Sequence, residues 1–212
     1  MIKAVIFAFD GVIVSTKRFH FMAWEKVAEI ESIDFNENIY NTIKDMPRME
    51  ALDTLLLNAH KKYKEMDKIR LSNQKNAIYL EMVNGITSND LLPGVFEIIR
   101  FFKENKVPMA IGSISRNCKA ILTLLEMNSV FQAVVDGNDI TRPKPDPEVF
   151  EKAARKLGVN PKDCLVIEDS IRGIEAAHSA EMQSFALGDA RQSRLATYYG
   201  LDLSEIETIF TI

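Results

Sequence analysis

The chain has 212 residues, 47% of them hydrophobic, which is enough to bury the core of one large domain or of a core with a smaller insert. Its formal net charge of −4 comes from interspersed acids and bases, and this excludes the basic stripe typical of a nucleic-acid partner. Because no apolar segment is long enough to span a bilayer and no secretory leader is evident, we expect a monomeric cytoplasmic protein without a membrane partner.

A short buried strand and a long helical block are predicted first along the chain. Residues 5–9 form a continuous apolar run that ends at Asp10 and Gly11, as a buried strand ends at a turn. We expect residues 15–87 to be a helical cap domain inserted after this strand, because their pattern is almost entirely helical. One apolar stripe there comprises Phe19, Ala23, Val27 and Ile30.

From Pro93 onward, amphipathic helices alternate with short apolar strands. This alternation is typical of a parallel sheet covered on both faces, so residues 1–14 and 88–212 are predicted to form a doubly wound, Rossmann-like α/β core. Ligands of such sheets bind beyond the carboxyl ends of the strands. Helices are predicted over 95–105, 118–127, 147–158 and 171–180, and strands over 107–112, 131–136, 164–169 and 183–188.

Polar residues stand at or after the ends of four predicted strands: Asp10, Ser113, Lys144 and the pair Glu168-Asp169. Each alone could be a helix cap, a turn residue or a solvated charge. Their recurrence at four strand ends instead predicts phosphate chemistry. Asp10 and Asp169 offer the hard oxygens that suit Mg²⁺, and Lys144 offers a positive charge. Ser113 and the N–H groups of the next helix can bind anionic oxygens.

These segments resemble, in order, the four motifs of the haloacid dehalogenase-like phosphotransferase superfamily, and the resemblance covers nearly the whole chain. The first motif of that superfamily is Asp-x-Asp-Gly, and it reads Ala8-Phe9-Asp10-Gly11 here. The inserted helical block resembles the β-phosphoglucomutase family more closely. The residues that match there are Phe19-His20-Phe21, Ala23-Trp24, Arg48 and Lys75-Asn76.

The resemblance implies the interconversion of β-glucose 1-phosphate and glucose 6-phosphate through an aspartyl phosphate and a bisphosphorylated sugar, with Mg²⁺ as cofactor. It implies that Asp10 moves the proton of the sugar hydroxyl. The implied Mg²⁺ ligands are Asp10, Asp169 and, directly or through water, Glu168.

The resemblance also implies how the phosphosugar is held. The implied ligands of the transferring phosphate are Ser113, the Ile114 N–H and Lys144. Those of the remote phosphate are Arg48, Ser115, Arg116 and Asn117, and the residues implied to face the sugar are His20, Trp24 and Lys75. From the residues alone, His20 and Trp24 could equally be packing residues of a helix.

Ala8 stands where the family has its nucleophilic aspartate. Because a methyl group can neither attack phosphorus nor bind a cation, we expect the chain as written not to turn over. Either Ala8 was introduced to silence an active enzyme, which the otherwise intact site favours, or the protein is a natural pseudoenzyme that binds a phosphosugar. Asp45 and Pro47 also replace a glycine and a serine of the mutase cap loop, which leaves the identity of the substrate open. The alternative activity is a sugar-phosphate phosphatase on the same scaffold, in which water instead of a sugar hydroxyl accepts the phosphoryl group.

Overall fold

The computed structural model describes residues 1–210, which fold as two units. Met1–Ser15 and the chain from Ile86 onward form the core unit, and Thr16–Gly85 form the cap unit. The cap unit is therefore one continuous insertion that begins shortly after the first strand of the core. The predicted doubly wound α/β core with a helical cap inserted after its first strand is confirmed.

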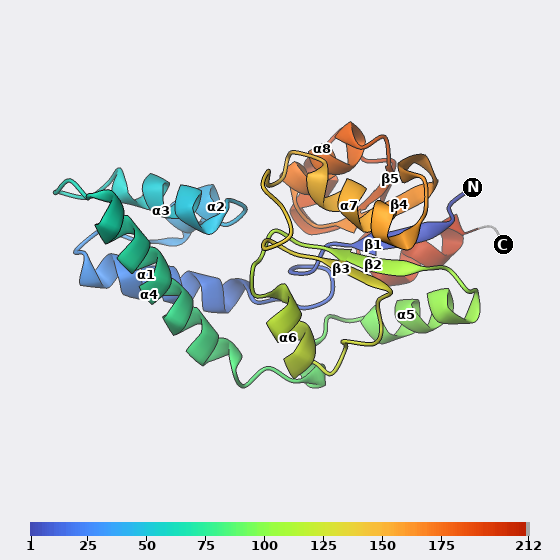
Figure 1. Ribbon diagram of the computed structural model, residues 1–212, viewed down its shortest axis with the longest axis horizontal. Helices are drawn as coiled ribbons and strands as arrows, with labels where there is room; N and C mark the ends of the chain where they lie inside the picture. Colours follow the sequence, from blue (N-terminus) through green and yellow to red (C-terminus); the bar gives the residue numbers. More distant parts are fainter. Residues whose placement is uncertain (211–212) are drawn as a thin grey trace. The chain divides into compact units, whose positions relative to one another are not determined.

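The core unit is built on a parallel six-stranded sheet with the order β3-β2-β1-β4-β5-β6 (Figure 1). Strands β1, β2 and β4 are buried along their full length, as expected for strands whose two faces are both covered. The strands are β1 (Ala4–Phe7), β2 (Met109–Gly112), β3 (Ala133–Val135), β4 (Cys164–Glu168), β5 (Gln183–Ala186) and β6 (Tyr198–Tyr199). The sequence did not predict β6, because two residues are too short to show a pattern.

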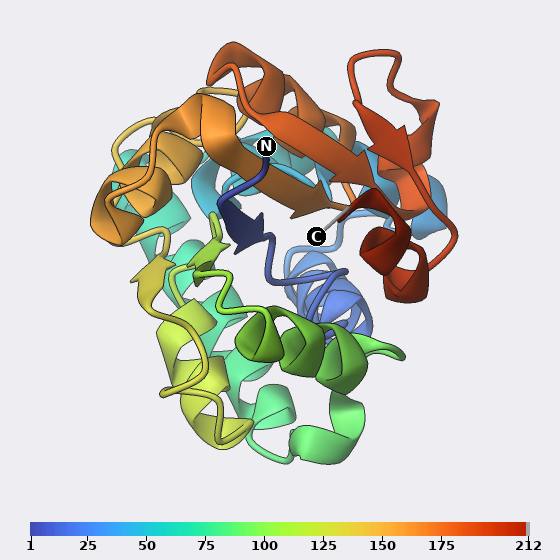
Figure 2. The ribbon, with the colours of Figure 1, turned by 90° about the vertical axis from the view of Figure 1, so that its right-hand side faces the viewer.

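Helices cover both faces of the sheet: α5 and α6 lie on one face, and α7 and α8 lie on the other (Figures 1 and 2). Phe7 shows the two-sided packing, because its ring meets Phe102 of α5 at 6.0 Å while its strand neighbour Ile6 packs in the cluster under α7. The helices are α5 (Val95–Glu104), α6 (Cys118–Leu124), α7 (Glu148–Leu157) and α8 (Ile171–Ser179). Short 3-10 turns lie at Ser88–Asp90, Pro161–Asp163, Gly188–Gln192 and Leu203–Ile209.

Helix α7 shows how the local sequence sets an element that later matters for the site. It begins directly after Pro147, carries Glu148 in its first turn, and ends at Gly158, which has φ +70°. A proline before the first turn and a left-handed glycine at the end are strong helix boundaries. Its buried face includes Val149 and Phe150, which pack on the sheet.

The cap unit is helical throughout, with α1 (Lys17–Ile30), α2 (Glu37–Ile43), α3 (Arg48–Leu56) and α4 (Glu65–Val83). Its core combines Val27, Leu52 and Leu55 with aromatic side chains such as Trp24. The predicted stripe of the first helix is wrong at Ile30, which is 48% exposed. The buried face of α1 instead turns through Ala23, Trp24, Val27 and Ala28.

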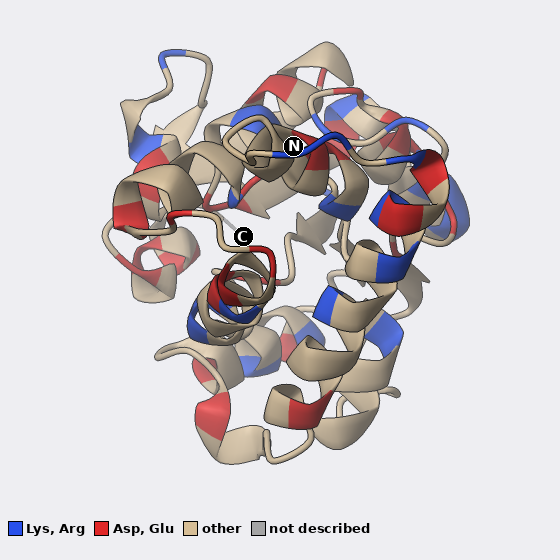
Figure 3. Ribbon diagram, turned by 90° about the vertical axis from the view of Figure 1, so that its left-hand side faces the viewer, with Lys and Arg blue, Asp and Glu red and all other residues tan. Residues whose placement is uncertain are grey.

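Figure 3 shows basic and acidic residues interspersed along the helices. Within residues 1–210, no helix combines the length and the apolar character needed to cross a membrane.

Candidate active site

The residues predicted to bear the chemistry of the core follow the ends of neighbouring strands. Phe7, the last residue of β1, is in register with Ile111 of β2 and Ile167 of β4. Ala8 follows at once, is only 3% exposed, and donates its N–H to the Ile167 carbonyl at 2.8 Å. Because the sheet is parallel, the segments after β1, β2 and β4 emerge at one edge.

The turn after β1 lies directly against the carboxylate of Asp169. Gly11 has φ +83°, and a Cβ added there would lie 1.9 Å from Asp169 Oδ2. Glycine is therefore required twice at this position, for its left-handed backbone and for the space that the carboxylate occupies. This contact places Asp169 next to the Asp10-Gly11 turn. Two of the residues predicted at strand ends, Asp10 and Asp169, are therefore neighbours.

Lys144 and Glu168 form a buried ion pair. Lys144 Nζ lies 2.7 Å from Glu168 Oε2, and the two side chains are 7% and 2% exposed. The ammonium also donates to the Gly112 carbonyl at 3.3 Å and lies 4.6 Å from the ring centre of Phe150. Two adjacent acids at a buried strand end need a compensating cation, and for Glu168 that cation is Lys144.

The loop from Ser113 to Asn117 follows β2 and is held by its own side chains. Ser113 Oγ accepts the Ser115 N–H at 3.1 Å, and Ser115 Oγ accepts the Asn117 N–H at 3.2 Å. The Ser113 N–H donates to the Val135 carbonyl at 2.9 Å, which fixes the loop to the end of β3. The structure therefore brings the predicted residues Ser113, Ser115 and Asn117 together in one ordered turn.

The oxygen donors available to a metal in the core are limited. Glu168 Oε1 accepts the N–H groups of Asp169 and Ser170 and the Ser170 hydroxyl, each at 3.0 Å, while its Oε2 is paired with Lys144. Across residues 1–210, no group of three or more His, Cys, Asp or Glu side chains is arranged to hold a metal ion. Of the predicted metal ligands Asp10, Glu168 and Asp169, Glu168 is the one paired with Lys144.

Two predicted site residues of the cap unit, His20 and Trp24, lie against a third, the buried Lys75. Lys75, 3% exposed on α4, places Nζ 2.6 Å from His20 Nδ1 and 5.0 Å from the ring centre of Trp24. Arg48, the first residue of α3, donates to the Ser72 carbonyl at 3.4 Å. Trp24 is only 3% exposed and belongs to the hydrophobic core of the cap, so it packs against Lys75 rather than presenting an open face.

The environment of His20 keeps its ring neutral. Burial of the ring, with the positive charges of Lys75 and Arg48, holds the pKa of His20 well below its ordinary value. Since an ammonium has no acceptor, the neutral ring accepts from Lys75 at Nδ1 and carries its proton on Nε2. His20 is therefore held as an oriented hydrogen-bonding group of the cap.

Replacing His20 by asparagine should weaken the acid sensitivity of the fold. Because the folded pKa of His20 lies below its unfolded value, the unfolded chain takes up a proton that the native chain refuses, and stability falls as the pH drops below about 6.5. The parent should lose up to about 1.4 kcal/mol of unfolding free energy per pH unit through this group. Urea unfolding at pH 5 and pH 7 measures the difference.

The matched control for this experiment is His178→Asn, which removes an exposed imidazole from α8. We expect the pH 5 to pH 7 difference to shrink in His20→Asn and to persist in His178→Asn. An equal pH dependence in parent and His20→Asn would show that the pKa of His20 is not lowered in the native state.

Tyr79 and Glu148 belong to these arrangements although the sequence analysis did not select them. The Tyr79 ring stacks on His20 with centres 4.1 Å apart, and its hydroxyl donates to Thr16 Oγ1 at 3.0 Å. Tyr79 lies four residues after Lys75 on one helix, and this spacing could have predicted that the two side chains share a face. Glu148 supports the loop of Lys144, and an acid in the first turn after a Pro-rich loop was its signal.

Comparison with known proteins decides which family has this arrangement. A family model described as haloacid dehalogenase-like hydrolase matches residues 2–181. The chain belongs to the haloacid dehalogenase-like hydrolase family. The resemblance seen in the sequence motifs is thereby confirmed at the level of the family.

Members of the haloacid dehalogenase-like family that are similar to this chain include mutases and phosphatases. A β-phosphoglucomutase of Bacillus subtilis strain 168 is 37% identical over 191 residues, which are 89% of this chain and 84% of the relative. A phosphorylated carbohydrates phosphatase of Thermotoga maritima is 31% identical, with 85% of this chain and 82% of the relative covered. The crystal structure of a β-phosphoglucomutase from Clostridium difficile matches with a TM-score of 0.90 at 34% identity, covering 98% and 96% of the two chains.

Proposed function

We propose that this chain is a β-phosphoglucomutase-type phosphotransferase whose turnover is blocked at Ala8. In the active form, with aspartate at position 8, it interconverts β-glucose 1-phosphate and glucose 6-phosphate through an aspartyl phosphate and a bisphosphorylated sugar. The observation that carries the proposal is the buried Lys144 ammonium at the strand edge that Ala8, Asp10 and Asp169 follow. The similarity to two β-phosphoglucomutases supports glucose phosphate as the substrate of this proposal.

Each residue of the core has a distinct role in the proposal. Lys144, the Ser113 hydroxyl and the Ile114 N–H bind the transferring phosphoryl group, and an ammonium held by Glu168 is already oriented for this. Asp10 gives and takes the proton of the sugar hydroxyl. Asp10 has nothing to assist while position 8 lacks a nucleophile, because no aspartyl phosphate can form.

The remote phosphate is assigned to Arg48 together with Ser115, Arg116 and Asn117. An arginine suits this role because its planar guanidinium can grip a phosphate through two hydrogen bonds. Lys75 and His20 of the cap contribute a charge and an oriented ring to sugar binding. Trp24 holds the Lys75 ammonium in place through its ring.

Mg²⁺ is part of the proposal because the donor atoms suit it. Mg²⁺ is commonly bound by one or two carboxylates, with waters and substrate phosphate oxygens completing its shell. Asp169 would supply a carboxylate and Asp10 its backbone carbonyl, and Glu168 would be reached through water because both its oxygens are engaged. When bound, Mg²⁺ offsets negative charge on the phosphoryl group.

A product assay on the Ala8→Asp variant tests the proposed reaction. The variant is incubated with Mg²⁺, β-glucose 1-phosphate and a glucose bisphosphate primer, and the products are separated. Glucose 6-phosphate formed without stoichiometric inorganic phosphate is the expected result. Release of inorganic phosphate with no glucose 6-phosphate would replace the mutase by a phosphatase.

The phosphatase is kept as a second candidate because of the cap loop before α3. Asp45 and Pro47 remove backbone freedom, one N–H and one hydroxyl from a segment that touches the sugar in the mutase pattern. The relatives also include a phosphorylated carbohydrates phosphatase. A natural noncatalytic phosphosugar-binding protein is a third reading, and an alanine codon at position 8 in the encoding gene would favour it.

A further inference from the structure

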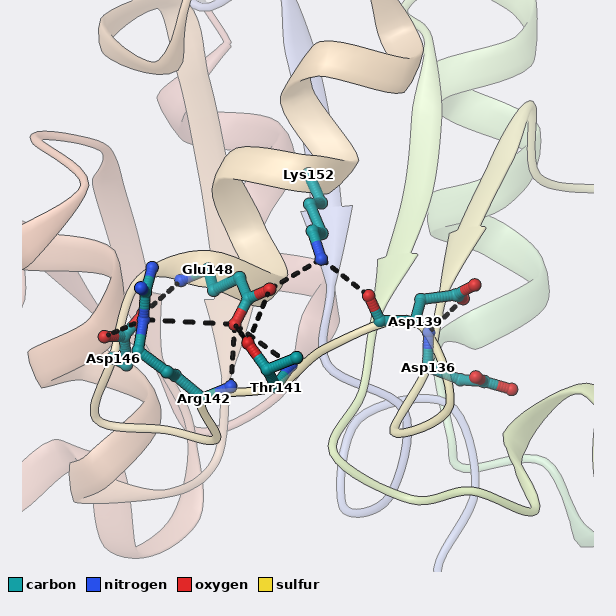
Figure 4. A network of polar contacts seen from close by, with 7 residues as sticks. All are labelled: Asp136, Asp139, Thr141, Arg142, Asp146, Glu148 and Lys152. Atoms are coloured by element: carbon teal, nitrogen blue, oxygen red, sulfur yellow. Dashed lines mark hydrogen bonds and ion pairs between the residues drawn. The ribbon is translucent and has the colours of Figure 1, made fainter.

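The loop that carries Lys144 is hydrogen-bonded to Glu148, the first residue of α7. Glu148 is 7% exposed, and its Oε2 accepts the Arg142 N–H at 2.7 Å and the Thr141 N–H at 3.1 Å (Figure 4). Lys152 Nζ donates to Glu148 Oε1 at 2.5 Å. The Lys152 ammonium and the Arg142 N–H lower the pKa of Glu148 to about 2, so the carboxylate stays ionised in this position.

Lys152 also connects the loop that carries Lys144 to the turn after β3. Lys152 Nζ also donates to the Asp139 carbonyl at 2.7 Å (Figure 4). Asp139 Oδ2 in turn accepts the Asp136 N–H at 3.0 Å and pairs with Lys119 Nζ at 2.7 Å. The segment between β3 and α7 is therefore hydrogen-bonded to α7 at Asp139, Thr141 and Arg142. Asp139 also holds the backbone of Asp136 at the end of β3.

The turn after β3 is also the direct support of the Ser113–Asn117 loop. Asn138 Nδ2 donates to the Arg116 carbonyl at 2.9 Å, and the Gly137 N–H donates to the Ser115 carbonyl at 3.2 Å. A Cβ at Gly137 would lie 2.2 Å from the Ile114 carbonyl oxygen, so the two backbones are in closest contact there. Movement of the 136–148 segment would shift Lys144 and the Ser113–Asn117 loop together.

We propose that Glu148 is a positioning residue for phosphate binding. It holds the loop of residues 141–147, which carries Lys144, and through Lys152 it sets the distance between that loop and the Ser113–Asn117 loop. This inference rests on the proposed function, which makes phosphate the ligand of both segments. The physical reason is preorganisation, because binding groups held rigidly by their supports lose less entropy and keep their geometry when the anion arrives. Glu148 itself touches no substrate in this scheme.

Titration of inorganic phosphate in the presence of Mg²⁺ tests the inference on the full chain with Ala8, so no turnover is needed. We expect Glu148→Gln to raise the Kd for phosphate about tenfold, because small displacements of a binding group are costly. Lys152→Met should raise it about threefold, since it removes one of the supports of Glu148. Lys156→Met is the matched control: Lys156 is exposed on the same helix, donates to the Val134 carbonyl at 3.1 Å, and should leave Kd unchanged.

Calorimetry separates positioning from simple loss of fold. A merely structural role would lower the fraction of binding-competent chain, seen as a lower stoichiometry, and would leave the Kd of that fraction unchanged. A Kd for Glu148→Gln equal to that of the parent would overturn the inference, as would an equal rise in Lys152→Met and Lys156→Met.

The paired variant Lys144→Met with Glu168→Gln distinguishes failure of the positioning role of Glu148 from failure of the proposed function. If the parent binds phosphate no better than the paired variant, phosphate is not the ligand of Lys144, and the proposed function and the inference both fall. If the paired variant loses phosphate while Glu148→Gln retains full affinity, only the positioning role is overturned.

Discussion

Replacement of Ala8 by aspartate is expected to raise kcat with β-glucose 1-phosphate by at least about 10⁴-fold, since loss of a catalytic nucleophile costs factors of this size or larger. The backbone at position 8 is held by the hydrogen bond to the Ile167 carbonyl at 2.8 Å, which does not depend on the side chain. The new carboxylate therefore starts from the end of β1, next to the Asp10 turn. The measurement is a coupled assay of glucose 6-phosphate formation with Mg²⁺ and a bisphosphate primer.

The Ala8→Asn variant is the matched control for this restoration. It has nearly the volume and polarity of the aspartate variant but no negatively charged oxygen for attack, so it should stay inert. Equal activity of the two variants would show that position 8 acts through shape. An inert Ala8→Asp variant that binds Mg²⁺ would overturn the assignment of position 8 as the nucleophile.

The same substitution should make stability dependent on Mg²⁺. Position 8 is only 3% exposed in the parent, and an uncompensated carboxylate buried there costs free energy. With Mg²⁺ present, a carboxylate at position 8 adds one ligand to the set, so Mg²⁺ should bind more tightly to the aspartate variant than to the parent. Calorimetric titration with Mg²⁺ would contradict this if the affinities were equal.

Replacing Lys144 by methionine is expected to cost about 3–5 kcal/mol of unfolding free energy, because it leaves the charge of Glu168 buried without its cation. The pair is 2.7 Å long with side chains 7% and 2% exposed, so water cannot take the place of the ammonium. Three donors to Glu168 Oε1 remain, and the cost is concentrated at Oε2. Urea unfolding at pH 7 measures the loss.

Two comparison variants separate burial from charge. Lys3 and Asp163 form an ion pair of similar length, 2.8 Å, with side chains 61% and 29% exposed, and Lys3→Met should cost no more than about 1 kcal/mol. The double variant Lys144→Met with Glu168→Gln should regain most of the stability, because it removes both charges. A double variant as unstable as Lys144→Met alone would show that the methionine itself disrupts the packing.

The local sequence carries most of the fold of the core unit. Continuous apolar runs such as the one that forms β1 predict buried parallel strands, and amphipathic segments such as α7 predict the helices that cover them. The order of the strands is not contained in these runs, because each is apolar on both faces and could lie beside any other. Ile30 shows a similar limit in the cap: it belongs to the apolar stripe of the first helix but is exposed. The spacing of apolar residues along a helix does not predict which of them a neighbouring helix covers.

For the site, residue types and spacing were enough to predict which chemical groups stand at the strand ends and that position 8 carries a methyl group. The tertiary structure alone decided how those groups pair: Glu168 takes Lys144 as its cation, Trp24 lies in the cap core, and Glu148 supports a loop that begins seven residues earlier. The reason is physical. Residue type and spacing are local properties, whereas the partner of a buried charge is fixed by which distant segments the packed sheet brings within hydrogen-bonding distance.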